Sequence, residues 1–412
     1  MHLDRRYAQD LDAADPLAPF RDRFDLPAGT IYLDGNSLGP LPKATADRVA
    51  QVVRQQWGRD LIASWNTHDW INMAQRIGDK IGRLVGAAPG EVLAGDSTSV
   101  NLFKLVAGAL ALRPGRRVVL SDTGNFPTDL YMVQGLSRLL EGRCELRLVD
   151  EAAVADAVDA NTALVMLTEV NYRTGRRHDM ADITRAAQAK GALVLWDLAH
   201  SAGAFPVDLN GCNADFAVGC GYKYLNGGPG APAFLFVAKR WQDAMRSPLS
   251  GWLGHEAPFA FDLAYRPGEG IRRQQCGTPP ILSLAALEVG VDLMLEADMA
   301  EIRRKSQAMT DLFIAGVRQE CAGFGFEIAT PAAHAARGSQ VSLRHPEGYA
   351  IMQALIRRGV VGDFRAPDIL RFGFTPLTLR YAEVWDAVQV LKDVMATAAW
   401  DRDELRQRAL VT

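Results

Sequence analysis

Short apolar runs alternate with helical segments from about residue 92 to residue 237, and this alternation constrains the fold more than any other feature. Six runs predict strands: 118–120, 144–149, 163–167, 192–196, 216–218 and 233–237. The apolar periodicity between them predicts helices over 98–112, 126–141 and 180–190. Continuous apolar strands separated by helices are typical of a mostly parallel sheet covered on both faces. We therefore expect an α/β fold.

The 412 residues are too many for one small domain. After about residue 285 the pattern changes to long helices and a few short strand-like runs, beginning with a helical stretch over 282–320. We expect a large α/β domain at 45–285 and a smaller α+β domain at 286–412. Residues 1–44 are expected to form an arm that packs on the small domain.

Composition excludes several classes of protein. The net charge of −3 gives no global attraction for nucleic acid or anionic membranes. Five cysteines form no CxxC pair and no metal-ligand spacing, so we expect a reducing, cytoplasmic compartment and no metal. The sequence contains no apolar stretch of membrane-spanning length and no apolar run of a signal peptide near its start.

Lys223 directly follows the predicted strand 216–218 and precedes a glycine-dense loop. In open α/β sheets, ligands bind outside the carboxyl ends of the strands. A lysine shielded from water there is shifted toward its neutral, nucleophilic form. Lys223 is thus a candidate for imine formation with a carbonyl cofactor, and a surface lysine in a turn is the alternative.

Asp197 ends another apolar run, and His200 follows three residues later. A carboxylate at that position would keep the pyridine nitrogen of pyridoxal phosphate (PLP) protonated, which helps the ring to withdraw electrons. The alternatives are a helix N-cap for Asp197 and a hydrogen-bonded turn residue for His200.

Three further segments carry weaker signals. Residues 95–101 place hydroxyl groups at the start of a predicted helix, which suits a phosphate or a plain N-cap. Phe126 enters a helix and could cover a flat ring or belong to the core. Arg371 lies in an apolar strand, so it should meet a carboxylate of the protein or of a substrate. The order of these signals along the chain is that of a fold-type I PLP enzyme.

The sequence resembles the kynureninases, within the class V aminotransferase-like group, over essentially its whole length. The resemblance rests on segments 32–39, 97–102, 125–129, 196–203, 221–230, 251–254 and 277–282. The GNSLG turn at 35–39 and GYKYLNGGPG at 221–230 are the sharpest of these motifs. The segment 65–68 matches the family only loosely.

The resemblance implies a role for each matching residue around the cofactor ring. Lys223 would form the imine, Asp197 would contact the ring nitrogen with Asp129 close by, and Phe126 would stack on the ring. The remaining cofactor-pocket residues that the resemblance implies are Thr98, Ser99 and Tyr222 at the phosphate, and Thr168 and His200 along the pocket.

The resemblance also implies a homodimer with shared active sites. Trp252 and Thr278 would reach the phosphate of the neighbouring subunit's cofactor, although some relatives carry Asn where Thr278 stands. Arg371 would bind the substrate α-carboxylate, with Ser37 as a second substrate-binding residue.

The implied activity is the PLP-dependent hydrolysis of L-kynurenine to anthranilate and L-alanine, in tryptophan breakdown. L-kynurenine and its 3-hydroxy derivative both remain possible substrates. Lys223 would also remove the α-proton, and Tyr222 is a candidate proton donor. Other classes considered are a cysteine desulfurase, a PLP-fold binding module and a nucleotide-binding Rossmann enzyme. The first would need a cysteine in a reactive loop, and Cys321 lies in no glycine-rich loop.

Overall fold

The computed structural model describes residues 3–408 and divides the chain into two compact units. The larger unit comprises Ala44–Asn171 and His178–Glu296, and the smaller unit comprises Met1–Lys43, Tyr172–Arg177 and Ala297–Thr412. Residues 1–2 and 409–412, the ends of the predicted arm and small domain, lie outside the described residues.

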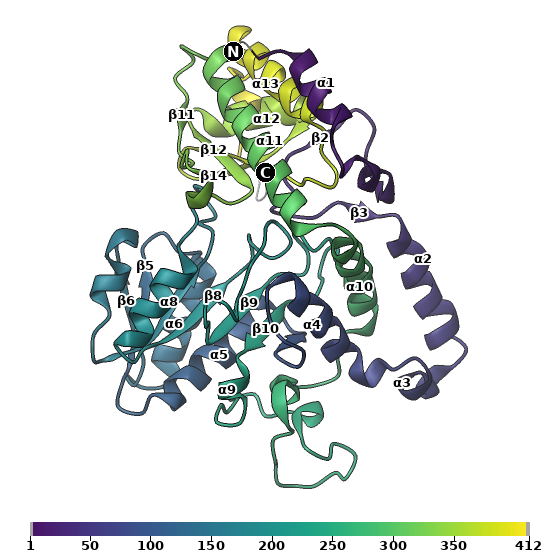
Figure 1. The fold of residues 1–412 in the computed structure, drawn as a ribbon, viewed down its shortest axis with the longest axis vertical. Coiled ribbons are helices and arrows are strands. Elements are labelled where there is room, and N and C mark those ends of the chain that lie inside the picture. Colours follow the sequence, from purple (N-terminus) through teal and green to yellow (C-terminus); the bar gives the residue numbers. More distant parts are fainter. Residues whose placement is uncertain (1–2, 409–412) are drawn as a thin grey trace. The chain divides into compact units, whose positions relative to one another are not determined.

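A seven-stranded sheet forms the centre of the larger unit (Figure 1), with the strand order β4-β10-β9-β8-β7-β5-β6. The strands are β4 (Val92–Ala94), β5 (Val118–Asp122), β6 (Glu145–Val149), β7 (Thr162–Thr168), β8 (Leu193–Asp197), β9 (Phe216–Gly219) and β10 (Phe234–Val237). Strands β5 to β9 pair in parallel, whereas β10 is antiparallel to both β9 and β4. The predicted, mostly parallel sheet is confirmed. Strand β4 was not among the strands predicted from the sequence.

Helices of the larger unit lie beside this sheet (Figure 1). They include α4 (Met73–Leu84), α5 (Thr98–Leu112), α6 (Pro127–Leu139) and α8 (Met180–Ala189), whereas α10 (Ile281–Glu296) packs on α4 and on α2 (Ala44–Gln51). The bounds of α5 match the prediction because Ser97 caps its first turn, accepting a hydrogen bond from Val100 N at 3.3 Å. Among residues 3–408, no helix has the length and apolarity that crossing a membrane requires.

The predicted domain boundary near residue 285 falls inside α10. This helix packs on α2 and α4, and Glu288 on α10 binds Arg76 at 3.1 Å and Lys80 at 2.9 Å. The predicted helix over 282–320 is interrupted after Glu296, because the side chain of Asp298 caps a new helix, α11 (Met299–Glu320). The larger unit therefore extends to Glu296.

The smaller unit contains a four-stranded antiparallel sheet in the order β11-β12-β15-β14. Its elements include β11 (Glu327–Ile328), β12 (Gln340–Arg344), β14 (Asp363–Arg365), β15 (Ile369–Gly373), α12 (Gly348–Arg357) and α13 (Tyr381–Ala396). A short strand near the N-terminus, β2 (Ile31–Tyr32), pairs in parallel with β13 (Val360–Val361). Phe313 of α11 packs against Phe372 and Phe374 in the core.

The first 43 residues belong to the smaller unit, and a buried ion pair contributes to their position. Lys305 Nζ lies 2.7 Å from Asp15 Oδ2, and both side chains are almost completely buried. Helix α1 (Arg5–Ala13) packs against α13. Breaking a buried pair by removing one partner typically costs about 3–5 kcal/mol, because the other charge is left uncompensated.

Candidate cofactor and substrate site

The cofactor candidates of the larger unit gather at the carboxyl ends of its parallel strands. Thr168 is the last residue of β7, Asp197 is the last residue of β8, and the two are paired in register. Lys223 follows four residues after the end of β9. Because β7, β8 and β9 run in parallel, these residues share one edge of the sheet, which is where ligands bind in such folds.

Two buried carboxyl groups lie together at this edge. Asp197 Oδ1 accepts a hydrogen bond from Ala199 N at 2.7 Å, which fixes the side chain. Burial raises the pKa of Asp197, and burial together with the charge of Asp197 raises the pKa of Asp129 well above its usual range. Oδ2 of Asp129 is buried and has no hydrogen-bond partner within residues 3–408. A protonated ring nitrogen would supply the positive charge and the donor that this pair needs.

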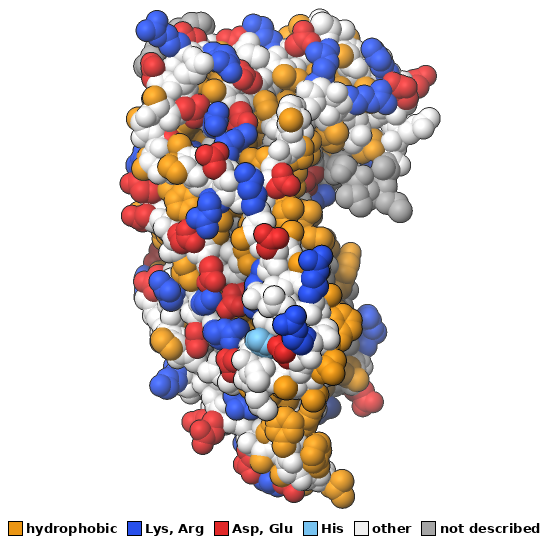
Figure 2. Space-filling model, turned by 90° about the vertical axis from the view of Figure 1, so that its right-hand side faces the viewer, with side chains coloured by type: hydrophobic (Ala, Val, Ile, Leu, Met, Phe, Trp, Pro, Cys, Tyr) orange, Lys and Arg blue, Asp and Glu red, His pale blue; other side chains and the backbone are white. Residues whose placement is uncertain are grey.

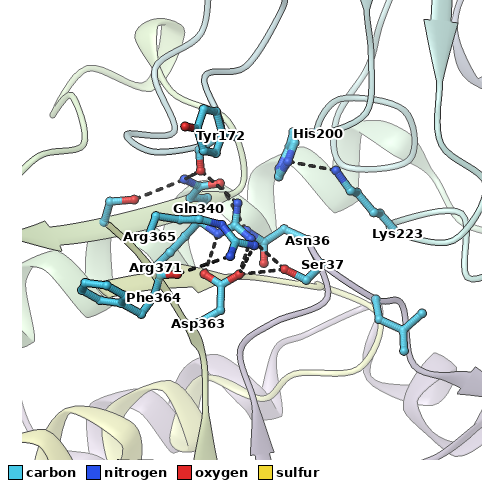
Figure 3. Close-up of polar contacts among 12 residues, drawn as sticks. Asn36, Ser37, Tyr172, His200, Lys223, Gln340, Asp363, Phe364, Arg365 and Arg371 are labelled. Carbon is cyan, nitrogen blue, oxygen red and sulfur yellow. Dashed lines mark hydrogen bonds and ion pairs between the residues drawn. The ribbon is translucent and has the colours of Figure 1, made fainter. Parts of the chain in front are cut away.

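The amine of Lys223 lies beside His200. The distance from Lys223 Nζ to His200 Nε2 is 3.1 Å, and Figure 3 shows the two groups pointing toward each other. Lys223 Nζ is also 5.8 Å from the ring centroid of Tyr222. Burial and the neighbouring Cys220 raise the pKa of Tyr222, so its phenol keeps its proton at neutral pH.

The start of α5 provides the candidate phosphate contacts. Thr98 and Ser99 occupy the first turn of this helix, where backbone N–H groups and the helix dipole favour an anion. Thr98 Oγ1 lies 3.3 Å from Cys220 Sγ, which places it against the segment that carries Lys223. The fully buried Lys104 supports the preceding loop by binding Asp96 and Gln274 O, each at 2.8 Å.

The candidate ring-covering residue is Phe126. Its side chain is 40% exposed, so it is available to a flat ligand and is not part of the core. Asn125 Oδ1 accepts from Phe126 N at 2.7 Å and from Thr168 Oγ1 at 3.0 Å. Asn125 was not among the predicted site residues, although it belongs to segment 125–129, one of the motifs that carried the resemblance.

Trp252 and Thr278 are both exposed, and they lie on either side of η7 (Gly270–Gln274) in the chain. Trp252 donates from Nε1 to Pro258 O at 2.6 Å and stacks on Phe261, with 6.5 Å between the ring centroids. These contacts lie within its own loop.

The smaller unit joins Arg371 of β15 to Ser37. Arg371 Nη2 donates to Ser37 Oγ at 2.7 Å, and Nη1 donates to Tyr172 O at 2.9 Å (Figure 3). Its Nε donates to Asp363 Oδ1 at 2.8 Å, and Nη2 also donates to Asp363 Oδ2. Arg371 therefore meets a protein carboxylate, which was one of the two alternatives that its sequence context allowed.

These contacts engage four of the five N–H groups of Arg371. Asp363 binds the edge of the guanidinium formed by Nε and Nη2. A second carboxylate would therefore bind through Nη1 and Nη2, in exchange for Ser37 or the Tyr172 carbonyl. Asp363 and its second arginine partner, Arg365, were not among the predicted residues.

The residues at the strand edge of the larger unit fit pyridoxal phosphate. A lysine amine is present for a covalent bond to the aldehyde, and its positive charge acts on two buried carboxyl groups at the same edge. A helix start with hydroxyl groups suits the phosphate, and Phe126 has an exposed ring.

Comparison with known proteins agrees with a PLP-binding site. A family model described as the kynureninase C-terminal domain matches residues 302–391. A kynureninase of Burkholderia pseudomallei (strain 1106a) is 56% identical over 413 residues, covering 99% of each chain. A kynureninase of Pseudomonas fluorescens is 51% identical over 407 residues, covering 98% of each chain.

Solved structures with low sequence identity share the fold. The cysteine desulfurase of Thermococcus onnurineus has a TM-score of 0.77 at 18% identity, covering 92% of this chain and 98% of its own. A C-DES variant with glycine covalently linked to its PLP cofactor has a TM-score of 0.78 at 20% identity, covering 90% and 99%. These structures confirm PLP fold type I.

Proposed function

Because the chain belongs to the kynureninase family, we propose that it hydrolyses L-kynurenine to anthranilate and L-alanine. It is a PLP-dependent hydrolase, and the similarity to curated kynureninases over almost the full length of both chains carries the assignment. The lysine and paired carboxyl groups at the strand edge support it at the level of residues.

Bound PLP supplies an electron-withdrawing ring. Asp197, supported by Asp129, would hold the positive charge at the ring nitrogen. Lys223 would remove the α-proton of the substrate with its Nζ and later return a proton to the same carbon. Water adds its oxygen to the side-chain carbonyl carbon, and the Cβ–Cγ bond then breaks. The added oxygen remains in the carboxylate of anthranilate, and a proton transferred to Cβ completes the methyl group of L-alanine.

We assign that last proton to Tyr222. The raised pKa of its phenol keeps the donor protonated at neutral pH, and the ring lies near Lys223. Thr98 and Ser99 would hold the phosphate, while Thr168 and His200 line the cofactor pocket. Arg371 would bind the α-carboxylate, with Ser37 beside it.

The test is the release of fluorescent anthranilate from L-kynurenine by the PLP-loaded protein. Steady formation of anthranilate that depends on added PLP is expected. A protein that binds PLP and reacts with amino acids without releasing anthranilate would refute the proposed substrate. Parallel assays with 3-hydroxykynurenine would compare the two substrates through their kcat/KM values.

The burial of Cys321 argues against its use in desulfuration, although the similar folds include cysteine desulfurases. A nucleophilic cysteine needs an accessible thiolate. Cys321 of the smaller unit is buried, and burial raises the pKa of its thiol to about 12. The five cysteines are unbridged, which supports a reducing compartment such as the cytoplasm.

A homodimer is part of the proposal because the loop after η6 (Trp252–Gly254) exposes apolar side chains. Phe259 is 62% exposed and Phe261 is 73% exposed. Apolar side chains gather at the lower end of Figure 2, and this loop lies at the lower end of Figure 1. A large exposed apolar patch usually marks an interface. A second copy would cover it and bring Trp252 and Thr278 to the partner's cofactor.

Sedimentation equilibrium tests the dimer. The wild-type protein is expected to sediment as a dimer, and the double variant Phe259→Asp, Phe261→Asp is expected to shift toward monomer and lose turnover. Leu139→Asp is the control, because it also places an aspartate at an exposed apolar residue, the last of α6. A fully active wild-type monomer would contradict the shared site.

A further inference from the structure

The buried ion pair of Arg371 and Asp363 has a third charged member, the half-buried Arg365. Asp363 on β14 and Arg371 on β15 are register partners, so the two strands hold this ion pair face to face. Asp363 also binds Arg365 Nη2 at 2.7 Å and accepts from Ser37 Oγ at 2.9 Å. Asp363 and Arg371 are both buried. The guanidinium groups of Arg365 and Arg371 thus share the single carboxylate of Asp363 (Figure 3).

The second carboxyl group of this cluster is Asp34, whose backbone forms a parallel β-bridge with Gly373, two residues after Arg371. Burial, followed by the charge of Asp363, raises the pKa of Asp34 to about 7, and Ser37, Arg371 and Arg365 oppose the rise. The other titratable group that faces it is Tyr32, whose pKa is itself raised by burial and by the charges of Asp34 and Asp363. Arginine stays protonated in proteins.

The net charge of the cluster follows from these groups. The cluster is defined by Asp34, Asp363, Arg365 and Arg371. With Asp34 neutral, two arginines and one carboxylate leave one positive charge. With Asp34 ionised, the net charge is zero. The cluster with neutral Asp34 is thus short of one negative charge, which a ligand carboxylate would supply.

We propose that Arg365 is a positioning residue that neutralises Asp363 and thereby keeps the charge of Arg371 available to the substrate α-carboxylate. The proposal rests on the proposed function, in which Arg371 binds that carboxylate. Without Arg365, Asp363 and Arg371 would neutralise each other, and a second carboxylate would enter a site with no net positive charge.

The proposal also gives Asp34 a part in binding. A ligand carboxylate adds a negative charge beside Asp34, so binding favours its protonated form. Affinity for a carboxylate should therefore be highest below pH 7 and should fall as the pH rises through 7 and Asp34 ionises.

The experiment is a titration of the PLP-loaded protein with L-alanine, followed by the change in cofactor absorbance. Ethylamine, which has the amine but no carboxylate, is titrated in parallel. Arg365→Gln is expected to weaken L-alanine binding by about tenfold or more, because Asp363 then neutralises the charge of Arg371. Ethylamine binding should stay unchanged, and Arg365→Lys should restore most of the L-alanine affinity.

Turnover should change in the same selective way. Arg365→Gln should raise KM for L-kynurenine by about tenfold and leave kcat nearly unchanged, because the attraction of Arg371 for the α-carboxylate is weakened in the ground state and the transition state alike. Arg344→Gln on the neighbouring β12 is the control, since its ion pairs with Glu327 and Asp368 lie outside the cluster. Equal weakening of L-alanine and ethylamine, or no rescue by lysine, would overturn the proposal.

The pH dependence gives a second readout. Both ligands must lose a proton from the amine to react with the cofactor, so the ratio of L-alanine affinity to ethylamine affinity removes that common pH dependence. This ratio should fall between pH 6 and pH 8 in the wild-type protein and stay flat in Asp34→Asn. A ratio that stays flat in the wild type would overturn the part assigned to Asp34. Because these titrations need no kynurenine, they remain informative even if anthranilate is never formed.

Discussion

Lys223→Ala is expected to abolish both the hydrolysis of L-kynurenine and the visible absorbance that PLP acquires on bonding to a lysine. The variant loses the group that bonds the cofactor and the base that moves the α-proton. Loss of a catalytic base alone costs about 10²- to 10⁴-fold in rate. We expect a decrease in kcat at the upper end of that range, measured by anthranilate fluorescence with saturating PLP.

The matched control is Lys239→Ala, at an exposed lysine that begins α9 (Lys239–Gln242) of the same unit. It should keep wild-type absorbance and turnover. Near-UV circular dichroism would show that Lys223→Ala is folded. Wild-type turnover by a folded Lys223→Ala protein would contradict the assignment of Lys223.

Arg371→Ala is expected to raise KM for L-kynurenine by about 30-fold or more, as for truncation of one partner of a buried charge pair. PLP binding should remain, because the cofactor candidates lie in the larger unit. Truncation also leaves Asp363 with Arg365 as its remaining arginine partner, so thermal unfolding must be measured alongside.

Arg371→Lys distinguishes the contribution of the positive charge from that of the planar guanidinium group. It keeps the positive charge but loses the planar fork that can hold two carboxylates at once. A KM between those of the wild type and Arg371→Ala is expected. An unchanged KM in both variants would contradict the assignment of the α-carboxylate to Arg371.

The sequence predicted the residues that lie at strand ends. Lys223 and Asp197 each follow a continuous apolar run, and in a parallel sheet the ends of neighbouring strands meet at one edge. Their neighbourhood was therefore predictable without coordinates. The direction in which each strand pairs was not predictable, because an apolar run has the same pattern in a parallel and in an antiparallel strand. Strand β10, for example, is antiparallel to its neighbours.

The residues around Arg371 show what the sequence could not supply. Asp363 meets Arg371 because β14 and β15 pair in one particular register, and a one-residue slip would separate them. Nothing in the local sequence fixes that register. The acidic and basic residues at 363 and 365, within an otherwise apolar stretch, were the available signal.

The fold alone does not choose the reaction. The cysteine desulfurase fold aligns with most of this chain at low identity, so one scaffold serves different chemistry. The choice must therefore depend on side chains at the site, which the fold does not determine.

The most direct test of the central claim is to run the hydrolysis of L-kynurenine in water labelled with heavy oxygen. Carbon–carbon hydrolysis predicts anthranilate and L-alanine in equal amounts, with one solvent oxygen in the anthranilate carboxylate and none in L-alanine. Mass spectrometry of both products would measure this. Unlabelled anthranilate, or the absence of L-alanine from a PLP-loaded protein that consumes L-kynurenine, would contradict it.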